Sequence, residues 1–161
     1  MARFALGVAG YAAGSRVDGP DPHDYRCAMR PLLRIEARNY GCLDHADVTL
    51  GALSVLVGPN GSGKSTLLDT IQFLGDAARD DLGPAVARRG GFEAMLFRGA
   101  RYTASIRLAI QAVVTKYASQ RLPDEYELDM WGHTIEPQFV LTRHESFTFK
   151  RRAGAGRRLT I

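Results

Sequence analysis

Nine consecutive residues, numbered 58 to 66, have the types and the spacing needed to bind a polyphosphate. They read Gly-Pro-Asn-Gly-Ser-Gly-Lys-Ser-Thr and fit the pattern G-x-x-x-x-G-K-[ST]. The glycines at 58, 61 and 63 can adopt conformations closed to residues with a Cβ, so consecutive backbone N–H groups can turn inward around one phosphate. The sequence therefore predicts a phosphate-binding loop at this position.

The polar residues of this loop have separate predicted roles. Lys64 supplies a mobile positive charge for the β- and γ-phosphates, the Ser65 hydroxyl is the predicted ligand of a bridging Mg²⁺ ion, and Thr66 donates to the α-phosphate. We expect a helix to begin near Lys64 and to add the partial positive charge of its unpaired N–H groups. No catalytic residue is assigned. The predicted nucleotide-binding residues are Gly58, Asn60, Gly61, Ser62, Gly63, Lys64, Ser65 and Thr66.

The segments on either side of the loop support this prediction. Residues 53–57 form a short apolar, partly β-branched run that predicts a buried parallel strand. After the loop, apolar residues recur at helical spacing, namely Leu67, Leu68, Ile71, Leu74 and Ala78. Strand, glycine loop and helix, in that order, distinguish a nucleotide site from an ordinary glycine-rich turn.

Length and composition predict one globular domain. The chain has 161 residues, of which 45% are hydrophobic and 24% charged. Cys27 and Cys42 are too few and too far apart for a zinc site and predict reduced thiols in a cytoplasmic protein. The histidines show no metal-binding spacing, so no transition metal is expected. No segment approaches the roughly 20 apolar residues of a membrane span, so no membrane partner is expected.

The two ends differ from the body of the chain. Residues 1–28 combine an Ala- and Gly-rich start with a run of Pro, Gly and Asp, and Met29 precedes the first predicted strand. This part is predicted to be disordered or an extension from a misplaced start codon. Residues 143–161 hold six Lys or Arg against one Glu. Their charge predicts either a DNA contact or the solvated tip of a β-hairpin.

The remaining pattern predicts further strands and a fold of the α/β class. Two strands precede the apolar run before the loop, and a short helix at residues 85–89 and a turn at residues 92–97 follow the loop helix. The strands are predicted at residues 32–37, 46–50, 102–114, 125–130, 134–141 and 146–151. We expect a mixed sheet around the loop, in a part spanning residues 29–80, and an antiparallel β-rich part at residues 81–161.

Several of these segments resemble one group of ATPases. Residues 33–40, Leu-Arg-Ile-Glu-Ala-Arg-Asn-Tyr, together with residues 44–50 and 55–74, are similar to the N-terminal lobe of ABC-type DNA-repair ATPases. The relatives are RecF, the structural-maintenance-of-chromosomes (SMC) proteins and AAA-type ATPases of bacterial defence systems. Arg-Arg-Gly-Gly-Phe at residues 88–92 is most similar to the last group. The resemblance covers residues 31–115 and implies a P-loop NTPase lobe that binds ATP and Mg²⁺ and acts on DNA or with a partner nuclease.

The chain departs from this group after the loop. No apolar strand ending in Asp-Glu, the Walker B motif, follows residue 66, because Asp124-Glu125 comes after Arg-Leu-Pro. The signature motif and switch histidine are also absent, and Gly41 stands where many relatives have arginine. We therefore expect an incomplete head domain, with hydrolysis requiring a protein partner or second half that supplies these elements. The alternative is a non-catalytic nucleotide-binding or interaction module, or a decayed fragment.

Overall fold

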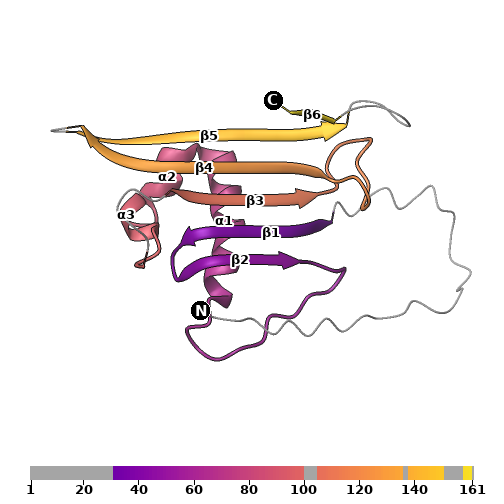
Figure 1. Cartoon of the computed structure of the whole chain (residues 1–161), viewed down its shortest axis with the longest axis horizontal. Helices are drawn as coiled ribbons and strands as arrows, with labels where there is room; N and C mark the ends of the chain where they lie inside the picture. Colours follow the sequence, from indigo (N-terminus) through magenta and orange to yellow (C-terminus); the bar gives the residue numbers. More distant parts are fainter. Residues whose placement is uncertain (1–30, 100–104, 136–137, 151–157, 161) are drawn as a thin grey trace, which may run out of the picture.

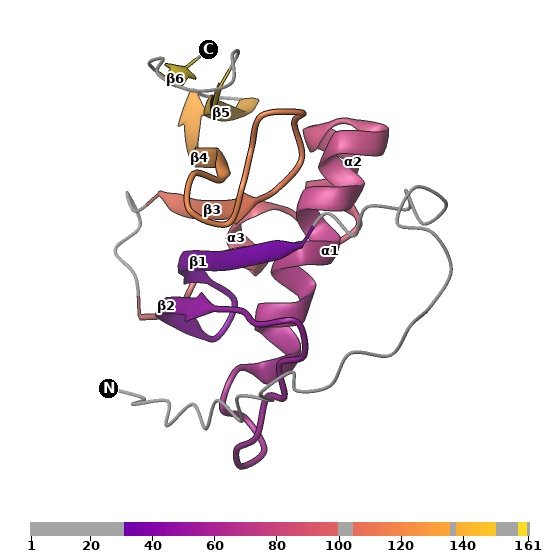
Figure 2. The same ribbon diagram turned by 90° about the vertical axis from the view of Figure 1, so that its right-hand side faces the viewer.

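The computed structural model describes residues 31–99, 105–135, 138–150 and 158–160, which form one sheet with helices on one face (Figure 1, Figure 2). The six strands lie in the order β2-β1-β3-β4-β5-β6. Their bounds are β1 (Leu32–Tyr40), β2 (Leu43–Thr49), β3 (Ile106–Ala112), β4 (Asp124–Ile135), β5 (Gln138–Lys150) and β6 (Arg158–Thr160). The prediction for residues 1–28 falls outside the described residues.

All of the described strand pairs are antiparallel. The α/β class is confirmed, whereas the predicted mixed sheet is wrong for this part of the chain. Because β1 pairs with both β2 and β3, the parts predicted at residues 29–80 and 81–161 share one sheet. A tight turn joins β1 to β2, the short connection that antiparallel neighbours allow.

The predicted buried strand at residues 53–57 is also wrong. These residues carry no strand, and the side chains of Leu53 and Val57 are 82% and 80% exposed. A parallel strand is buried only when neighbouring strands pair with it and helices cover it. In the described residues no strand pairs with this segment, so Leu53, Val55 and Val57 remain exposed to solvent.

Other predicted strands form with different lengths. The strands predicted at residues 32–37 and 46–50 both form, as parts of β1 and β2. The three strands expected between residues 125 and 151 are instead two long ones, β4 and β5, which pair from Glu125 and Thr148 to Ile135 and Gln138. The strands of the predicted C-terminal hairpin form as the end of β5 and β6, while its tip, residues 151–157, lies outside the described residues.

Three helices follow the glycine loop: α1 (Lys64–Asp80), α2 (Leu82–Ala87) and α3 (Phe92–Met95). Helix α1 confirms the predicted loop helix and crosses the face of the sheet (Figure 1). Its buried face holds Leu67, Phe73 and Leu74, whereas Leu68 and Ile71 of the predicted apolar face are exposed. The helix predicted at residues 85–89 is α2, and the turn predicted at residues 92–97 contains α3.

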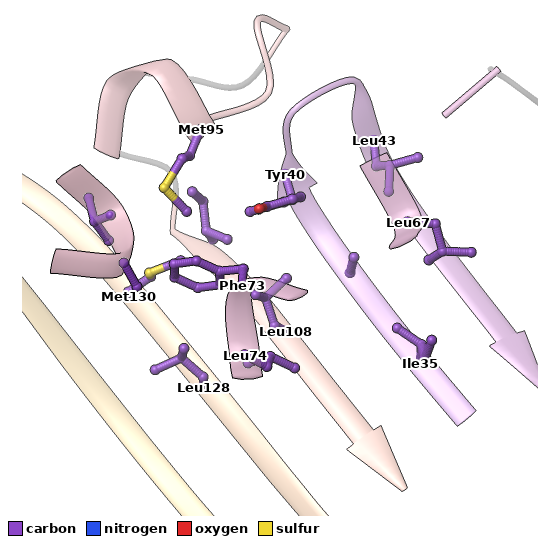
Figure 3. Close-up of a cluster of buried hydrophobic side chains, with 14 of the residues drawn as sticks. Ile35, Tyr40, Leu43, Leu67, Phe73, Leu74, Met95, Leu108, Leu128 and Met130 are labelled. Carbon is purple, nitrogen blue, oxygen red and sulfur yellow. The ribbon is translucent and has the colours of Figure 1, made fainter. Parts of the chain in front are cut away.

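The hydrophobic core lies between the sheet and α1 (Figure 3). Phe73 of α1 and Tyr40 of β1 have ring centroids 6.0 Å apart, and Leu108 and Met130 come from the central strands β3 and β4. Burial of such side chains contributes roughly 1.5–3 kcal/mol each. This packing fixes α1, and hence the loop that precedes it, against the end of β1. No helix of the described residues is long and apolar enough to cross a membrane.

Candidate nucleotide site

The glycine loop runs into the first turn of α1, and two of its three glycines, Gly61 and Gly63, adopt the left-handed conformations that the sequence predicts, whereas Gly58 does not. Gly61 has φ 79° and Gly63 has φ 91°, both in the left-handed region that favours glycine. A Cβ at Gly63 would lie 2.5 Å from Cδ2 of Leu43, at the start of β2. Glycine is therefore required at position 63 both by backbone conformation and by close packing against β2.

The ammonium group of Lys64 turns back into the loop. It donates to the carbonyl oxygens of Gly58, at 2.8 Å, and Pro59, at 2.7 Å, and to Oγ of Ser62, at 3.1 Å. An ammonium group has three N–H donors, and each finds an acceptor here. The loop thus closes around one positive charge at the beginning of α1, while Asn60 and Gly61 form its exposed turn.

The first turn of α1 offers unsatisfied N–H groups next to this charge. The residue that precedes the helix, Gly63, provides no side-chain cap, and the first turn holds no acidic residue. Ser65 and Thr66 place their hydroxyls in the same turn. Helices usually satisfy their first N–H groups with a capping side chain or with an anion. This helix start has the features of an anion site: free backbone donors, the helix dipole and an adjacent ammonium group.

The turn between β1 and β2 lies directly against this helix start. Sγ of Cys42 lies 3.0 Å from Oγ1 of Thr66, and a Cβ at Gly41 would lie 2.7 Å from Cγ2 of Thr66. The backbone N–H of Gly41 donates to the carbonyl oxygen of Met95, at 2.6 Å. The structure therefore brings the loop, the β1–β2 turn and α3 together at one end of α1.

Arg89, Asp69, Asp76 and Tyr40 form a cluster of polar side chains one helical turn beyond the loop. The sequence predicted no role for these residues. Arg89 pairs with Asp69, with Nη2 to Oδ1 at 2.9 Å, and with Asp76, with Nη1 to Oδ2 at 3.0 Å. The guanidinium also lies 5.0 Å from the ring centroid of Phe73. The hydroxyl of Tyr40 donates to Asp69. In the sequence, the signals that could have pointed to this cluster were the Asn-Tyr pair at residues 39–40 and the Arg-Arg-Gly-Gly segment at residues 88–91, which the family resemblance singled out.

Burial and hydrogen bonding keep Tyr40 protonated in this cluster. Burial raises the pKa of the Tyr40 phenol above its ordinary value, and the hydrogen bond to the Asp69 carboxylate raises it further. The phenol therefore donates to Asp69 throughout the neutral range. The cluster links β1 to the face of α1 that continues from Ser65 and Thr66.

Two acidic residues that follow the loop in the sequence, Asp124 and Glu145, have structural roles. Asp124 is buried and accepts from the N–H groups of Val114 and Thr115, at 3.1 and 2.6 Å, so it fastens the loop before β4. Glu145 accepts from Tyr126 and pairs with Arg143. Within the described ranges no cluster of three or more His, Cys, Asp or Glu residues forms a metal site.

A glycine loop that opens a helix packed on a sheet is the loop-and-helix part of the P-loop NTPase arrangement, although the strand that precedes the loop there does not form at residues 53–57. Comparison with known families gives the more particular assignment. Residues 53–148 match the family model described as an AAA domain, putative AbiEii toxin, type IV TA system. The match covers more than half of the chain, which therefore belongs to this family of AAA domains.

A short segment of the chain is similar to one curated protein. The chain is 48% identical over 46 residues to an OLD nuclease of Thermus scotoductus. The aligned part is 28% of this chain and 9% of the nuclease, so the similarity spans a small share of that protein. No solved structure matched the chain.

Proposed function

We propose that the chain binds Mg-ATP through residues 58–66, as the N-terminal lobe of an ATPase of the RecF, SMC and bacterial-defence group. The observation that carries the proposal is the uncapped start of α1 beside the Lys64 ammonium, within the loop. In this function the N–H groups of the loop and of Ser65 and Thr66 bind phosphate oxygens. Lys64 exchanges loop carbonyls for the β- and γ-phosphates.

The residues present fit a magnesium ion held together with phosphates. Mg²⁺ prefers oxygen ligands and keeps several waters, and in NTPases it is bound by one or two protein groups plus phosphate oxygens. The Ser65 hydroxyl, in the first turn of α1, is a suitable single ligand, and the described residues form no cage of acids around it. When bound, the ion neutralises charge that develops on the phosphates.

Hydrolysis, in this proposal, requires strands that the described residues do not provide. Residues 53–57 lead into the loop with Leu53, Val55 and Val57 exposed, while Leu56 packs against the core. A row of exposed apolar side chains in an unpaired segment favours pairing with another strand. We propose that a strand ending in Asp-Glu, from a partner protein or a second half, pairs here and supplies the water-positioning carboxylate.

The similarity to an OLD nuclease leads us to propose a role in defence or DNA repair. Its DNA contact would come from the basic C-terminal residues. Arg143, the first of these, pairs with Asp81 at 3.0 Å and with Glu145 at 3.0 Å, so its charge is already neutralised. The proposed contact therefore depends on the basic residues from Lys150 onward.

Titration calorimetry of the full chain with Mg-ATP tests the proposed site. We expect saturable binding to the wild type and at least a tenfold loss in Lys64→Ala, because one charge-assisted contact contributes about 1.5–3 kcal/mol. Lys116→Ala is the matched control, since Lys116 contacts the Tyr117 ring and not the loop. Equal binding by both variants and the wild type would contradict the proposal.

A non-catalytic nucleotide-binding module is the second candidate. It is favoured by the structural roles of Asp124 and Glu145, which leave neither carboxylate free to serve as the missing Walker B acid. The steady-state rate of ATP hydrolysis, measured with the chain alone and again after a partner is added, separates the two candidates. A rate that stays at background with every partner strand supplied favours the module.

A further inference from the structure

A pocket of ≈ 360 Å³ lies beside the phosphate loop, between the first turns of α1, the end of β1 and α3. Its lining includes Gly41 of the β1–β2 turn, Ser65, Thr66 and Asp69 of α1, and Ala94 and Met95 of α3. Ser65 and Thr66 thus belong both to this pocket and to the candidate phosphate site. The pocket is within the size range, about 300–1,000 Å³, that holds small ligands in proteins.

We propose that this pocket binds the ribonucleoside part of the nucleotide, with the ribose hydroxyls donating to the carboxylate of Asp69. The inference rests on the proposed function, because it takes the phosphates to lie at the loop. It adds a sugar-recognising residue and a base-contacting surface to that site. Neither is part of the glycine-loop motif.

The position of Asp69 on α1 suits this role. Asp69 follows Ser65 by four residues and Thr66 by three, so the three side chains lie on one face of the helix. One helical turn, about 5.4 Å, separates Asp69 from the phosphate-binding end. A ligand that places its phosphates at the start of α1 and extends along this face therefore brings its next chemical group, the sugar, to Asp69.

The chemistry of the pocket favours a neutral group with hydrogen-bond donors over a second anion. Asp69 accepts from Arg89 and from Tyr40, which hold its carboxylate in place, yet its side chain remains 40% exposed. Ionised carboxylates only accept hydrogen bonds, and a ribose diol offers two O–H donors. The positive charge of Arg89 is shared between Asp69 and Asp76. Arg88 and Arg79 also approach Asp76, so the charges of the cluster balance, and the exposed side of the Asp69 carboxylate is left as an acceptor for a sugar hydroxyl.

The opposite side of the pocket is suited to a base. Ala94 is exposed and Met95 is buried, and both come from α3, which a hydrogen bond from Gly41 to Met95 holds near the loop. Ala94 therefore offers the exposed apolar surface on this side, while Met95 packs in the core beneath it. Gly41 has φ 56°, and a Cβ there would collide with Thr66, so glycine at this position lets the β1–β2 turn pack directly against α1 at the edge of the pocket.

Calorimetry of the full chain with three ligands separates sugar recognition from phosphate binding. The ligands are ATP, 2′-deoxy-ATP and inorganic tripolyphosphate, each with Mg²⁺. We expect ATP to bind about tenfold more tightly than 2′-deoxy-ATP, the effect of one hydrogen bond to a charged group. Asp69→Asn, which nearly preserves the shape of the side chain, should reduce this preference to under about threefold. Its affinity for tripolyphosphate should remain that of the wild type.

A second variant tests the pocket even if Asp69→Asn fails to fold. Ala94→Trp places a large ring in the pocket from an exposed position and should weaken ATP binding without changing tripolyphosphate binding. The control is Ala78→Trp, the same change at an exposed position of α1 about 20 Å from Lys64. Equal affinity of the wild type for all three ligands would overturn the nucleoside pocket and leave the phosphate site standing. Binding of none of them would overturn both.

Discussion

Nη2 of Arg89 lies 2.9 Å from Oδ1 of Asp69, although 20 positions separate the two residues in the chain. The pair joins the Arg-Gly-Gly turn after α2 to α1, one turn below the phosphate loop. Asp76 and the ring of Phe73 contact the same guanidinium. A single side chain thus connects the region after α2 to the helix that carries the candidate site.

Arg89→Ala should lower the free energy of unfolding by about 2–3 kcal/mol. The Arg89 side chain is 13% exposed, and its removal leaves the partly buried carboxylate of Asp76 without this partner. Arg79→Ala is the matched control, because Arg79 is 75% exposed and approaches the same Asp76 only to 4.0 Å. Its expected effect is below about 0.5 kcal/mol. Urea denaturation measures both, and equal losses would contradict the assigned role of Arg89.

Nucleotide should protect Cys42 from alkylation. The thiol is exposed and lies 3.0 Å from the Thr66 hydroxyl, so a phosphate at the start of α1 would restrict access to it. We expect maleimide labelling of a Cys27→Ser protein to slow severalfold in saturating Mg-ATP. The same experiment with Lys64→Ala is the control and should show no protection. Labelling at the same rate with and without nucleotide would place the phosphates elsewhere.

Val55→Lys should change the free energy of unfolding of this chain by no more than about 0.5 kcal/mol, because the Val55 side chain is 63% exposed. Val48→Lys, in contrast, should cost more than about 3 kcal/mol, because Val48 of β2 is 4% exposed and packs in the core. Chemical denaturation compares the two. A large loss in Val55→Lys would show that residues 53–57 are buried in solution.

In Asp47→Asn, the free energy of unfolding should fall less between neutral and acid pH than it does in the wild type. Arg34 donates two hydrogen bonds to Asp47, at 2.7 and 2.6 Å, and holds the pKa of that carboxyl below its usual range. A carboxyl with a lowered folded-state pKa stabilises the fold above about pH 4 and loses this effect as the pH falls through its folded pKa.

The pair is exposed, so the difference between the wild type and Asp47→Asn at pH 7 should stay below about 1 kcal/mol. It should shrink as the pH falls below about 4 and through the folded pKa of Asp47. Asp44→Asn, an exposed carboxylate of the same strand, is the control. Urea denaturation at several pH values measures the effect, and a difference that grows toward low pH would contradict the assignment.

The local features of this protein follow from short stretches of its sequence. The loop glycines, the order of Lys64, Ser65 and Thr66, and the helix that follows depend on neighbouring residues, so the motif and its periodicity were enough to predict them. Strands β1 and β2 were predictable for the same reason, since alternation and a tight turn are short-range signals. The AAA-domain family was likewise indicated by contiguous segments.

The way in which these parts meet is visible only in the folded chain. Residues 53–57 have the composition of a buried strand, yet Leu53, Val55 and Val57 are exposed, because no strand of the described residues pairs with this segment. Arg89, Asp69 and Tyr40 form one cluster because the packing of α1 on the sheet brings distant segments together. Spacing along the chain cannot predict such contacts, since they arise from the packing of whole elements and not from the preferences of neighbouring residues.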